Sequence, residues 1–398
     1  MLYGKDIICH ALPTWEGDYM KAVVQLMAEL AKHNRVIYVN YAYTYKDLLG
    51  GALGKNNTPI NKVLGKEGRL KSKLKFENGE LFILYPPPVM PTNFIKSERI
   101  YYKSQSRQAY KVGKAINHAQ NQLGFKSPIV INAFNPQFGL PLVDKLNESL
   151  RVYYCYDEIN AAQWCKEHGG RIEQEYLTKV DGVVVTSEGL LASKSTYNSN
   201  CFLVKNGVDH SLFTNAMNLN LKSDKVIGYI GSIDDRIDYD LLGKIANAYQ
   251  NFRIKLIGRV TYDYAFEFES KQDNVELTGA KQPKALAQEL KEVDLGLIPF
   301  VTNEFTKNIY PLKVNEYLAA GKAVVSTHFA SLSEFEKHIS IADNHNDFLN
   351  AVEDELKNDS IQKQKERNEF AKENSWANRA EIFSQIIDDL LITTSEKS

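Results

Sequence analysis

The sequence has few cysteines, and their spacing does not suit a disulfide framework or a zinc site. The four cysteines of this 398-residue chain have no CxxC spacing and no paired histidines nearby; they are Cys9, Cys155, Cys165 and Cys201. Disulfide scaffolds and zinc modules depend on closely spaced cysteines. We therefore expect neither a disulfide framework nor a metal site, and this cysteine usage fits a reducing cytoplasm.

Long hydrophobic runs are also missing. No stretch approaches the roughly 18 uninterrupted apolar residues of a membrane-spanning helix. The first residues, MLYGKDIICHALPTWEGDY, lack the basic start, apolar core and cleavage site of a signal peptide. We expect a cytoplasmic protein, and any membrane contact should be peripheral, at the inner face of the membrane.

Charge of one sign is not in excess. Lys and Arg number 48 against 49 Asp and Glu, a formal charge of −1, which excludes a general nucleic-acid binder. Apolar residues at 43% and charged residues at 24% are ordinary for a globular protein. A chain of this length exceeds what one hydrophobic core usually supports, so the length predicts two domains.

What the sequence does contain is a repeated alternation of apolar strands and amphipathic helices. Residues 6–12, 19–33 and 35–40 read as strand, helix and strand, a unit that implies a parallel sheet. The alternation continues to residue 204, breaks at the turn Asn206-Gly207, and starts again at Val226. We predict an α/β protein with two Rossmann-like, doubly wound domains facing a cleft, residues 1–206 and 207–375. Residues 376–398 should form a helix that packs back on the first domain.

Residues 41–75 depart from this alternation. They hold eight Lys and Arg residues against only Asp47 and Glu67, with tyrosines at one end. One interpretation is a solvated insertion with a disordered tip. The other is a basic, aromatic-edged surface that rests on anionic lipid or on a lipid-diphosphate acceptor.

Residues 305–325, FTKNIYPLKVNEYLAAGKAVV, carry the most chemistry. Pro311 suits the start of a helix, where free backbone N–H groups and the helix dipole can bind a diphosphate. Lys313 would add a positive charge to that site. Glu316, one turn further on, can accept both hydroxyls of a ribose, and Gly321 ends the helix.

The segment PLKVNEYLAAGKAVVST resembles the donor-site helix of GT-B glycosyltransferases of the GT4-like group, in which two acidic residues eight positions apart are typical. The second acid matches Glu316. The first falls on Asn308, which departs from the pattern and would act near the donor sugar as a hydrogen-bonding substitute. The resemblance also implies donor contacts from the residues between them, Ile309, Tyr310, Pro311 and Leu312.

Other segments carry the same resemblance. Residues 205–209, KNGVD, resemble the domain junction of these enzymes. Gly231, Ser232 and Arg236 resemble the phosphate loop after the first donor-domain strand, where glycine admits a diphosphate and arginine neutralises it. A strand-ending turn with a solvated Arg236 is the alternative. Gly279, after VELT, fits the turn near the nucleotide base.

In the first domain, Trp15, Glu16 and Gly17 follow the first strand, where such enzymes meet the acceptor; packing of Trp15 is the alternative. Asp157, after the strand YYCY, takes the position of a donor-proximal histidine in relatives, which implies a catalytic role. Its alternative role is structural, in the core or as a helix N-cap. These segments, with WEGDYMKAVVQLMAELAKHNRVIYV, are most similar to teichuronic-acid-type glycosyltransferases.

The resemblance implies a hexosyltransferase-like enzyme that moves a sugar from a nucleoside diphosphate donor, UDP or GDP, to a glycan or lipid-linked acceptor. It implies retention, no metal and no further cofactor, and a role in bacterial cell-surface polysaccharide or glycoconjugate synthesis. Lys313 and Arg236 would stabilise the leaving diphosphate. Two alternatives remain: another GT-B enzyme, such as a nucleotide-sugar epimerase or a phosphorylase, and a catalytically silent scaffold that binds a nucleotide sugar or a partner protein.

Overall fold

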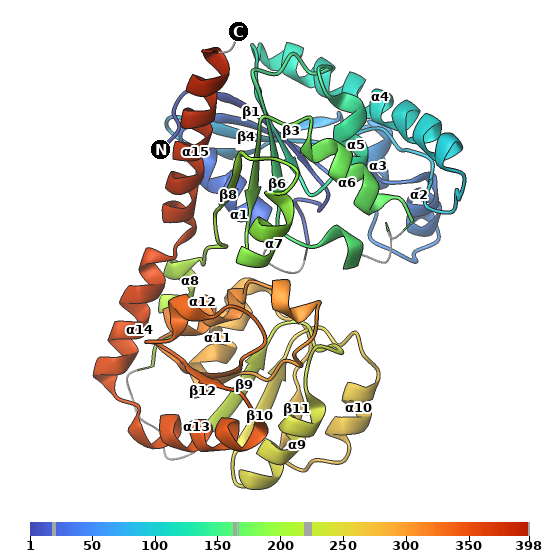
Figure 1. Ribbon diagram of the computed structural model, residues 1–398. Coiled ribbons are helices and arrows are strands. Elements are labelled where there is room, and N and C mark those ends of the chain that lie inside the picture. Colours follow the sequence, from blue (N-terminus) through green and yellow to red (C-terminus); the bar gives the residue numbers. More distant parts are fainter. Residues whose placement is uncertain (18–20, 162–164, 166, 219–224, 397–398) are drawn as a thin grey trace. The chain divides into compact units, whose positions relative to one another are not determined.

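The chain forms two compact units (Figure 1), in a computed structural model that describes residues 1–17, 21–161, 165, 167–218 and 225–396. The first unit comprises Met1–Gly17, Lys21–Lys205 and Arg379–Ser398, and the second comprises Asn206–Asn378. The chain crosses between the two units twice, after Lys205 and after Asn378. The segments next to these crossings are paired, because the backbone N–H of Trp376 donates to Val208 O at 3.1 Å. Gly207 lies against this crossing, where a Cβ would come within 2.8 Å of the Trp376 backbone nitrogen.

Within the described residues, the first unit holds an eight-stranded sheet of order β3-β4-β2-β1-β5-β6-β7-β8. Its strands are β1 (Asp6–Ala11), β2 (Arg35–Val39), β3 (Leu70–Lys75), β4 (Glu80–Leu84), β5 (Ile129–Ala133), β6 (Leu150–Cys155), β7 (Gly182–Val185) and β8 (Cys201–Leu203). All pair in parallel except β3 with β4. The central strands are apolar because parallel sheets are covered on both faces.

The first unit's helices follow the strands along the chain. They are α1 (Ala22–Leu30), α2 (Tyr45–Ala52), α3 (Ile60–Leu64), α4 (Glu98–Leu123), α5 (Pro136–Gly139), η1 (Leu140–Leu142), η2 (Ile159–Ala161), α6 (Gly169–Leu177) and α7 (Glu188–Lys194). The last helix, α15 (Trp376–Ser395), returns to this unit. Its Phe383 ring lies 5.9 Å from that of Tyr154, and Leu390 fills the space beside Gly182.

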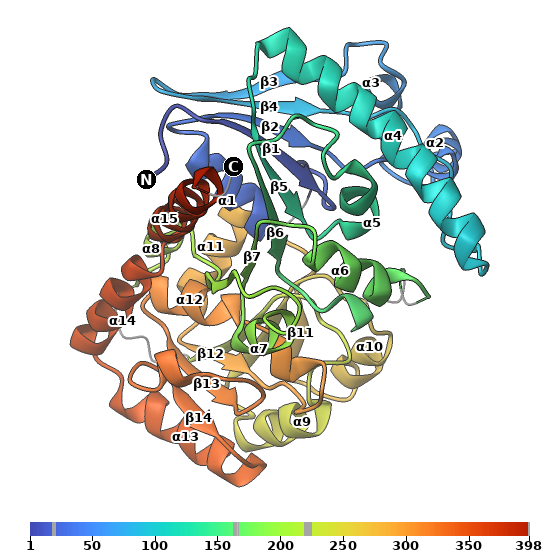
Figure 2. The same cartoon turned by 45° about the horizontal axis from the view of Figure 1, so that its top comes forward.

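Residues 41–75 are largely exposed, as expected for a solvated insertion, and they contain α2, α3 and β3, which the sequence did not predict. Thr44 and Asp47 form a capping box at the start of α2, and β3 adds an antiparallel edge to the sheet. Helix α4, which the sequence did not predict, runs along the outside of the unit beside α5 (Figure 2). Its buried face includes Gln105, Gly113 and Gln120, which a search for apolar periodicity does not register.

Within the described residues, the second unit holds a six-stranded parallel sheet of order β11-β10-β9-β12-β13-β14. Its strands are β9 (Val226–Ile230), β10 (Arg253–Ile257), β11 (Val275–Leu277), β12 (Leu295–Ile298), β13 (Ala323–Thr327) and β14 (Ser340–Ala342). Its helices are α8 (His210–Thr214), α9 (Tyr239–Ala248), α10 (Tyr264–Glu269), α11 (Pro283–Glu292), η4 (Thr306–Asn308), α12 (Leu312–Ala319), η5 (Ser333–Phe335), α13 (His345–Asn358) and α14 (Ile361–Glu373).

The strand order reverses beside β1 in the first unit and beside β9 in the second. This pattern confirms the expected pair of doubly wound units. Open α/β sheets bind ligands at such switch points, outside the carboxyl ends of the strands. The loops after β1 and β9 are therefore the places to look for sites. In the described part of the chain, no helix has the length and apolar character needed to cross a membrane.

Candidate functional site

The loop after β9 meets the first turn of α12. Gly231 follows β9 with a φ of +123°, a conformation that side chains rarely adopt. A Cβ at this position would clash with Cε of Lys313, and the carbonyl of Gly231 itself lies where a Cβ on Gly258 would be. Glycine at 231 therefore lets Lys313 lie directly against the loop backbone.

Lys313 is held between two aromatic rings. Its ammonium nitrogen lies 5.5 Å from the ring centre of Tyr229 and 4.9 Å from that of Phe300, within the range of a cation–π contact. Burial and, after it, the nearby positive charge of Arg236 lower the pKa of Lys313 to about 8. The ammonium is thus poorly compensated, and an anion bound beside it would relieve that cost.

Arg236 is the second cation at this edge. Asp234 orients it, because the guanidinium donates from Nε to Oδ1 at 2.9 Å and from Nη2 to Oδ2 at 2.5 Å. The guanidinium carbon lies 5.4 Å from the centre of the Phe300 ring, which Lys313 also contacts. Both cations therefore share one aromatic platform.

Glu316 lies one turn after Lys313 on α12. Burial raises its pKa to about 7, and the charge of Lys313 only partly offsets that effect. Within the described chain, its carboxyl group makes no hydrogen bond. A partly buried carboxylate in this state can accept two hydroxyl groups of a ligand.

Tyr317 anchors α12 to the sheet, and the sequence did not point to it. Its hydroxyl donates to Gly228 O and accepts from Ile230 N, both at 2.9 Å. Strand β9 pairs with β12 only as far as Gly228 and Gly296. The Tyr317 hydroxyl therefore bonds to β9 at the point where that pairing ends. A Cβ on Gly296 would come within 2.7 Å of the Tyr317 ring, so glycine there makes room for the anchor.

The structure brings the predicted residues Gly231, Arg236, Lys313 and Glu316 together. Ser232 follows Gly231, and its carbonyl accepts from the Tyr229 hydroxyl at 2.7 Å. Gly279 has a φ of +73° just beyond β11, at the outer edge of the same sheet.

The residues before α12 are held mainly by packing. Ile309 and Tyr310 pack against the core of the second unit, and Pro311 is buried at the N-cap position. Leu312, half-buried, opens the helix. Asn308 ends η4, and its side chain lies outside the described residues.

In the first unit, Trp15 and Glu16 are tied to neighbouring loops. The backbone N–H of Trp15 donates to Asn40 Oδ1 at 2.6 Å, and the Trp15 ring packs edge-on against Tyr38. Glu16 accepts from the Tyr85 hydroxyl and, at 3.3 Å, from Asn40. Burial raises the pKa of Glu16, but these hydrogen bonds outweigh burial and the pKa is lowered overall.

Gly17 follows with a φ of +152°, and a Cβ there would come within 2.7 Å of Lys21 Nζ. Lys21 also donates to the carbonyl of Thr14 at 2.6 Å. The loop after β1 is thus closed on itself by a lysine, which holds Trp15 and Glu16 in place.

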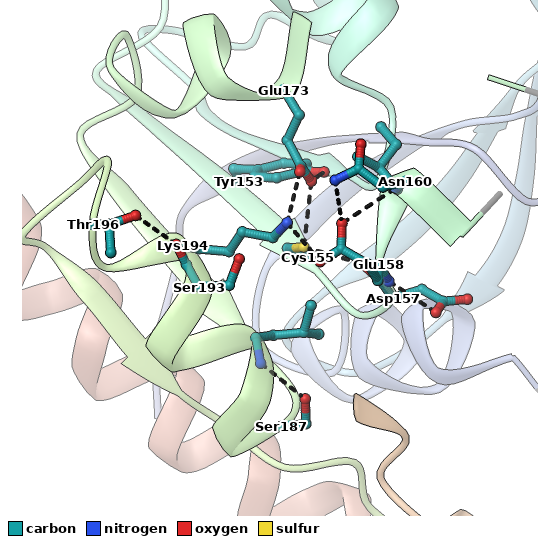
Figure 3. A network of polar contacts seen from close by, with 12 residues as sticks. Tyr153, Cys155, Asp157, Glu158, Asn160, Glu173, Ser187, Ser193, Lys194 and Thr196 are labelled. Carbon is teal, nitrogen blue, oxygen red and sulfur yellow. Dashed lines mark hydrogen bonds and ion pairs between the residues drawn. The ribbon is translucent and has the colours of Figure 1, made fainter. Parts of the chain in front are cut away.

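Asp157 is exposed just beyond β6, and its Oδ1 accepts from the Glu158 N–H at 2.9 Å. A buried network fixes the loop in which it lies (Figure 3). Lys194 reaches Glu158 at 3.0 Å and Glu173 at 2.8 Å, and the Tyr153 hydroxyl donates to Glu173 at 2.7 Å.

The opposite charges of Lys194 and its two carboxylate partners stabilise this network. Burial raises the pKa of Glu173, whereas the two carboxylates raise the pKa of Lys194 in spite of its burial. Glu158 also accepts two hydrogen bonds from Asn160, at 2.9 and 3.2 Å. The partners are 36 and 21 residues from Lys194 along the chain, so no local motif could have revealed them.

Comparison with known proteins extends this description. Residues 224–358, which contain the whole cluster around Lys313, match the family Glycosyl transferases group 1. A putative teichuronic acid biosynthesis glycosyltransferase of Bacillus subtilis is 28% identical over 186 residues, 44% of this chain and 47% of that protein. The match thus spans about half the length of the curated relative.

Solved structures resemble the chain over nearly its full length. A sucrose-phosphate synthase from Thermosynechococcus elongatus gives a TM-score of 0.70 at 16% identity, covering 98% of this chain and all of that one. A UDP-forming trehalose-phosphate synthase from Burkholderia xenovorans in complex with glucose-6-phosphate gives 0.66 at 12%, covering 97% and 100%.

Anabaena HepE in complex with UDP and glucose gives a TM-score of 0.60 at 11% identity, covering 97% of this chain and 100% of that one. At these identities the likeness establishes the fold. The chain therefore has the GT-B fold, and residues 224–358 of its second unit match the group 1 glycosyltransferase family.

Proposed function

We propose that the chain is a glycosyltransferase that moves a sugar from a nucleoside diphosphate, UDP or GDP, to a hydroxyl of a glycan or lipid-linked acceptor. Residues 207–375 would bind the donor, and residues 1–206 with 376–398 the acceptor. The observation that carries this proposal is the cluster of Lys313, Arg236 and Glu316 against the bare backbone of Gly231.

The electrostatics of this cluster suit a leaving diphosphate. As the bond between the sugar and the phosphate breaks, negative charge grows on the phosphate oxygen. Lys313 and Arg236 are fixed in place beforehand by the Phe300 ring and Asp234, so they need not reorganise when that charge appears. Glu316 would hold the ribose hydroxyls and so keep the diphosphate in register with the cations.

For the chemical step we infer retention of configuration, with no metal and no further cofactor. The acceptor oxygen would attack the anomeric carbon on the face that the diphosphate leaves. The proton of the acceptor hydroxyl would pass to the leaving phosphate oxygen. Asp157 and Asn308 would contribute polar contacts to the transferred sugar. The pattern of the GT4-like group and the two fixed cations support this scheme.

The acceptor side would work next to a membrane, in the synthesis of bacterial cell-surface polysaccharide or another glycoconjugate. The name of the Bacillus subtilis relative supports the polysaccharide role. Helix α2 and the turn after it support peripheral contact with anionic lipid at the cytoplasmic face: Leu49 and Leu53 are each 64% exposed, and Lys46 and Lys55 are exposed as well.

The test combines donor binding with product release. Purified protein is screened by thermal shift against UDP-, GDP- and dTDP-sugars, and nucleoside diphosphate release is then followed with and without a lipid-linked acceptor. Glu316→Ala should abolish the donor-induced stabilisation. Glu304→Ala is the matched control, because that carboxylate is exposed and pairs with Lys307 three residues away.

Unchanged stabilisation of Glu316→Ala would remove the ribose-binding role. If no donor yields nucleoside diphosphate, the transferase proposal fails. A catalytically silent scaffold is the second candidate, because Asn308 stands where the family pattern has an acid. Donor stabilisation without any product release would favour the scaffold, and release of an altered nucleotide sugar would favour an epimerase.

A further inference from the structure

The first unit contains a cavity of about 330 Å³ at the carboxyl ends of its central strands. The loops after β1, β2, β4 and β5 contribute to its walls, together with α4. Its volume falls within the roughly 300–1,000 Å³ of small-molecule sites, and its position beside the strand-order reversal at β1 is where open α/β sheets bind ligands. The residues on which the argument rests are Tyr41, Thr92, Tyr101, Gln105, Asn135 and Phe138.

Aromatic rings form one part of this cavity, and neighbouring rings hold them in place. His168 stacks on Tyr101 with ring centres 4.0 Å apart. Tyr43 packs edge-on against Tyr41 at 5.2 Å, and Phe138 meets His10 edge-on at 5.8 Å. Fixed rings of this kind offer flat apolar surfaces to a ligand without a large loss of side-chain entropy.

Buried amides and a hydroxyl form the other part. Thr92, Gln105 and Asn135 are 6%, 4% and 4% exposed, and the Thr92 hydroxyl donates to the Gln105 amide oxygen at 3.1 Å. The Asn135 amide nitrogen lies 3.4 Å from His10 Nε2, but the amide oxygen has no partner among the described residues. Whichever way this amide is turned, His10 can pair with only one end of it.

An unpaired buried amide end is uncommon, because leaving a buried polar group unsatisfied is costly. Asn135 lies on the wall of the cavity. Its amide oxygen is shielded from solvent, so the side chain would have to turn to present the unpaired end to a ligand hydroxyl. Burial lowers the pKa of His10 to about 4, which keeps the ring neutral at physiological pH. The imidazole that pairs with Asn135 from outside the cavity therefore carries no charge.

The same holds for the wall of the cavity. Among the described residues that line the cavity, none is Asp, Glu, Lys, Arg or His. Burial raises the pKa of Tyr41, and it raises that of Tyr101 to about 12, so both phenols remain neutral hydrogen-bonding groups. A phosphate would find no countercharge here, whereas an uncharged polyol would find both apolar rings and hydrogen-bonding partners.

We propose that this cavity binds one uncharged pyranose ring, with the aromatic rings against its C–H face and Gln105 and Asn135 on its hydroxyls. Its role as the acceptor subsite rests on the proposed transferase function; the binding of a neutral sugar does not. The loop of Trp15, Glu16 and Gly17 does not line this cavity. That loop, unlike the cavity, carries an ion pair, because Glu16 lies 3.8 Å from Lys62.

Saturation-transfer difference NMR on the full chain tests it. The probes are methyl glucopyranoside and methyl N-acetylglucosaminide at millimolar concentration, with glucose 6-phosphate and uridine as the charged and the planar comparison. We expect saturation of the pyranoside C–H protons. Asn135→Leu should weaken pyranoside binding about fivefold, as expected for one lost hydrogen bond.

Tyr41→Ala should weaken binding at least as much, and Tyr41→Phe, which keeps the ring, should retain most of it. Tyr110→Ala is the matched control, because Tyr110 is 61% exposed on α4 and does not line the cavity. Circular dichroism and thermal unfolding check that each variant is folded. If Asn135→Leu does not fold, Tyr41→Ala and Gln105→Leu test the same wall from two other elements.

Stronger variant-sensitive signals from glucose 6-phosphate or uridine would overturn the proposal, and so would the absence of variant-sensitive binding of either pyranoside. The two proposals fail separately. Nucleoside diphosphate release without pyranoside binding would disprove this inference and leave the transferase standing. Pyranoside binding without release from any donor would leave a carbohydrate-binding cavity in a protein that is not a transferase.

Discussion

At the scale of single residues, the cluster of Lys313, Arg236 and Glu316 contains two groups whose pKa values lie close together. Burial brings the pKa of Glu316 up to about 7 and that of Lys313 down to about 8. The carboxylate exists above the first value and the ammonium below the second. Donor binding that uses both charged forms therefore has a narrow optimum between them.

This gives a prediction for the pH dependence of donor affinity. As pH falls through about 7, Glu316 takes up a proton and affinity should drop; as pH rises through about 8, Lys313 loses its proton and affinity should drop again. Isothermal titration calorimetry with the best donor measures both limbs, each with a slope of at most about tenfold per pH unit.

Two variants assign the limbs. Glu316→Gln should remove the acid limb, and Lys313→Arg should remove the alkaline limb, because guanidinium does not titrate in this range. A profile that keeps both limbs in both variants would show that other groups govern binding.

At the scale of elements, the site depends on how α12 is fixed to β9. Lys313 and Glu316 lie on a helix of only eight residues, and Tyr317 ties that helix to the sheet where two strands part. The positions of the Lys313 and Glu316 side chains therefore depend on the buried hydroxyl of Tyr317.

Tyr317→Phe should test this dependence. It leaves the Ile230 N–H and the Gly228 carbonyl without the partner they share, which costs about 1–3 kcal/mol of stability. Donor affinity should fall as well, as measured by the thermal shift per donor concentration. Tyr264→Phe is the control, because Tyr264 is 41% exposed at the start of helix α10, and it should change neither quantity. Loss of stability with unchanged donor affinity would show that α12 holds its position without the anchor.

The same scale shows what the sequence can predict. The parallel strands and α12 follow from apolar runs and from turn residues such as Pro311 and Gly321, and the structure bears them out. Helix α4 was not predicted from the sequence, because its buried face is partly polar. Lys194 and Tyr317 escaped because their partners are distant along the chain, and only the fold brings them together.

At the scale of the whole molecule, each unit has a hydrophobic core of its own. One core, centred on β9, β12 and α12, is built from residues 208–371, and other clusters belong to the first unit. The Lys313 cluster and its anchors all lie in Asn206–Asn378. The second unit thus contains everything the structure assigns to the proposed nucleotide site.

Because each unit has its own hydrophobic core, the second unit can be tested by itself. A fragment of residues 206–378 should fold and should keep the donor-induced thermal shift of the full chain, although it should release no nucleoside diphosphate, because the proposed acceptor side is missing. Lys313→Met in the fragment removes a charged partner of the diphosphate, and the shift should shrink by the equivalent of about 10- to 100-fold in affinity. A fragment with a cooperative unfolding transition but no response to any donor would mean that residues of the first unit complete the donor site. In that case the cluster around Lys313 would be one half of a shared site.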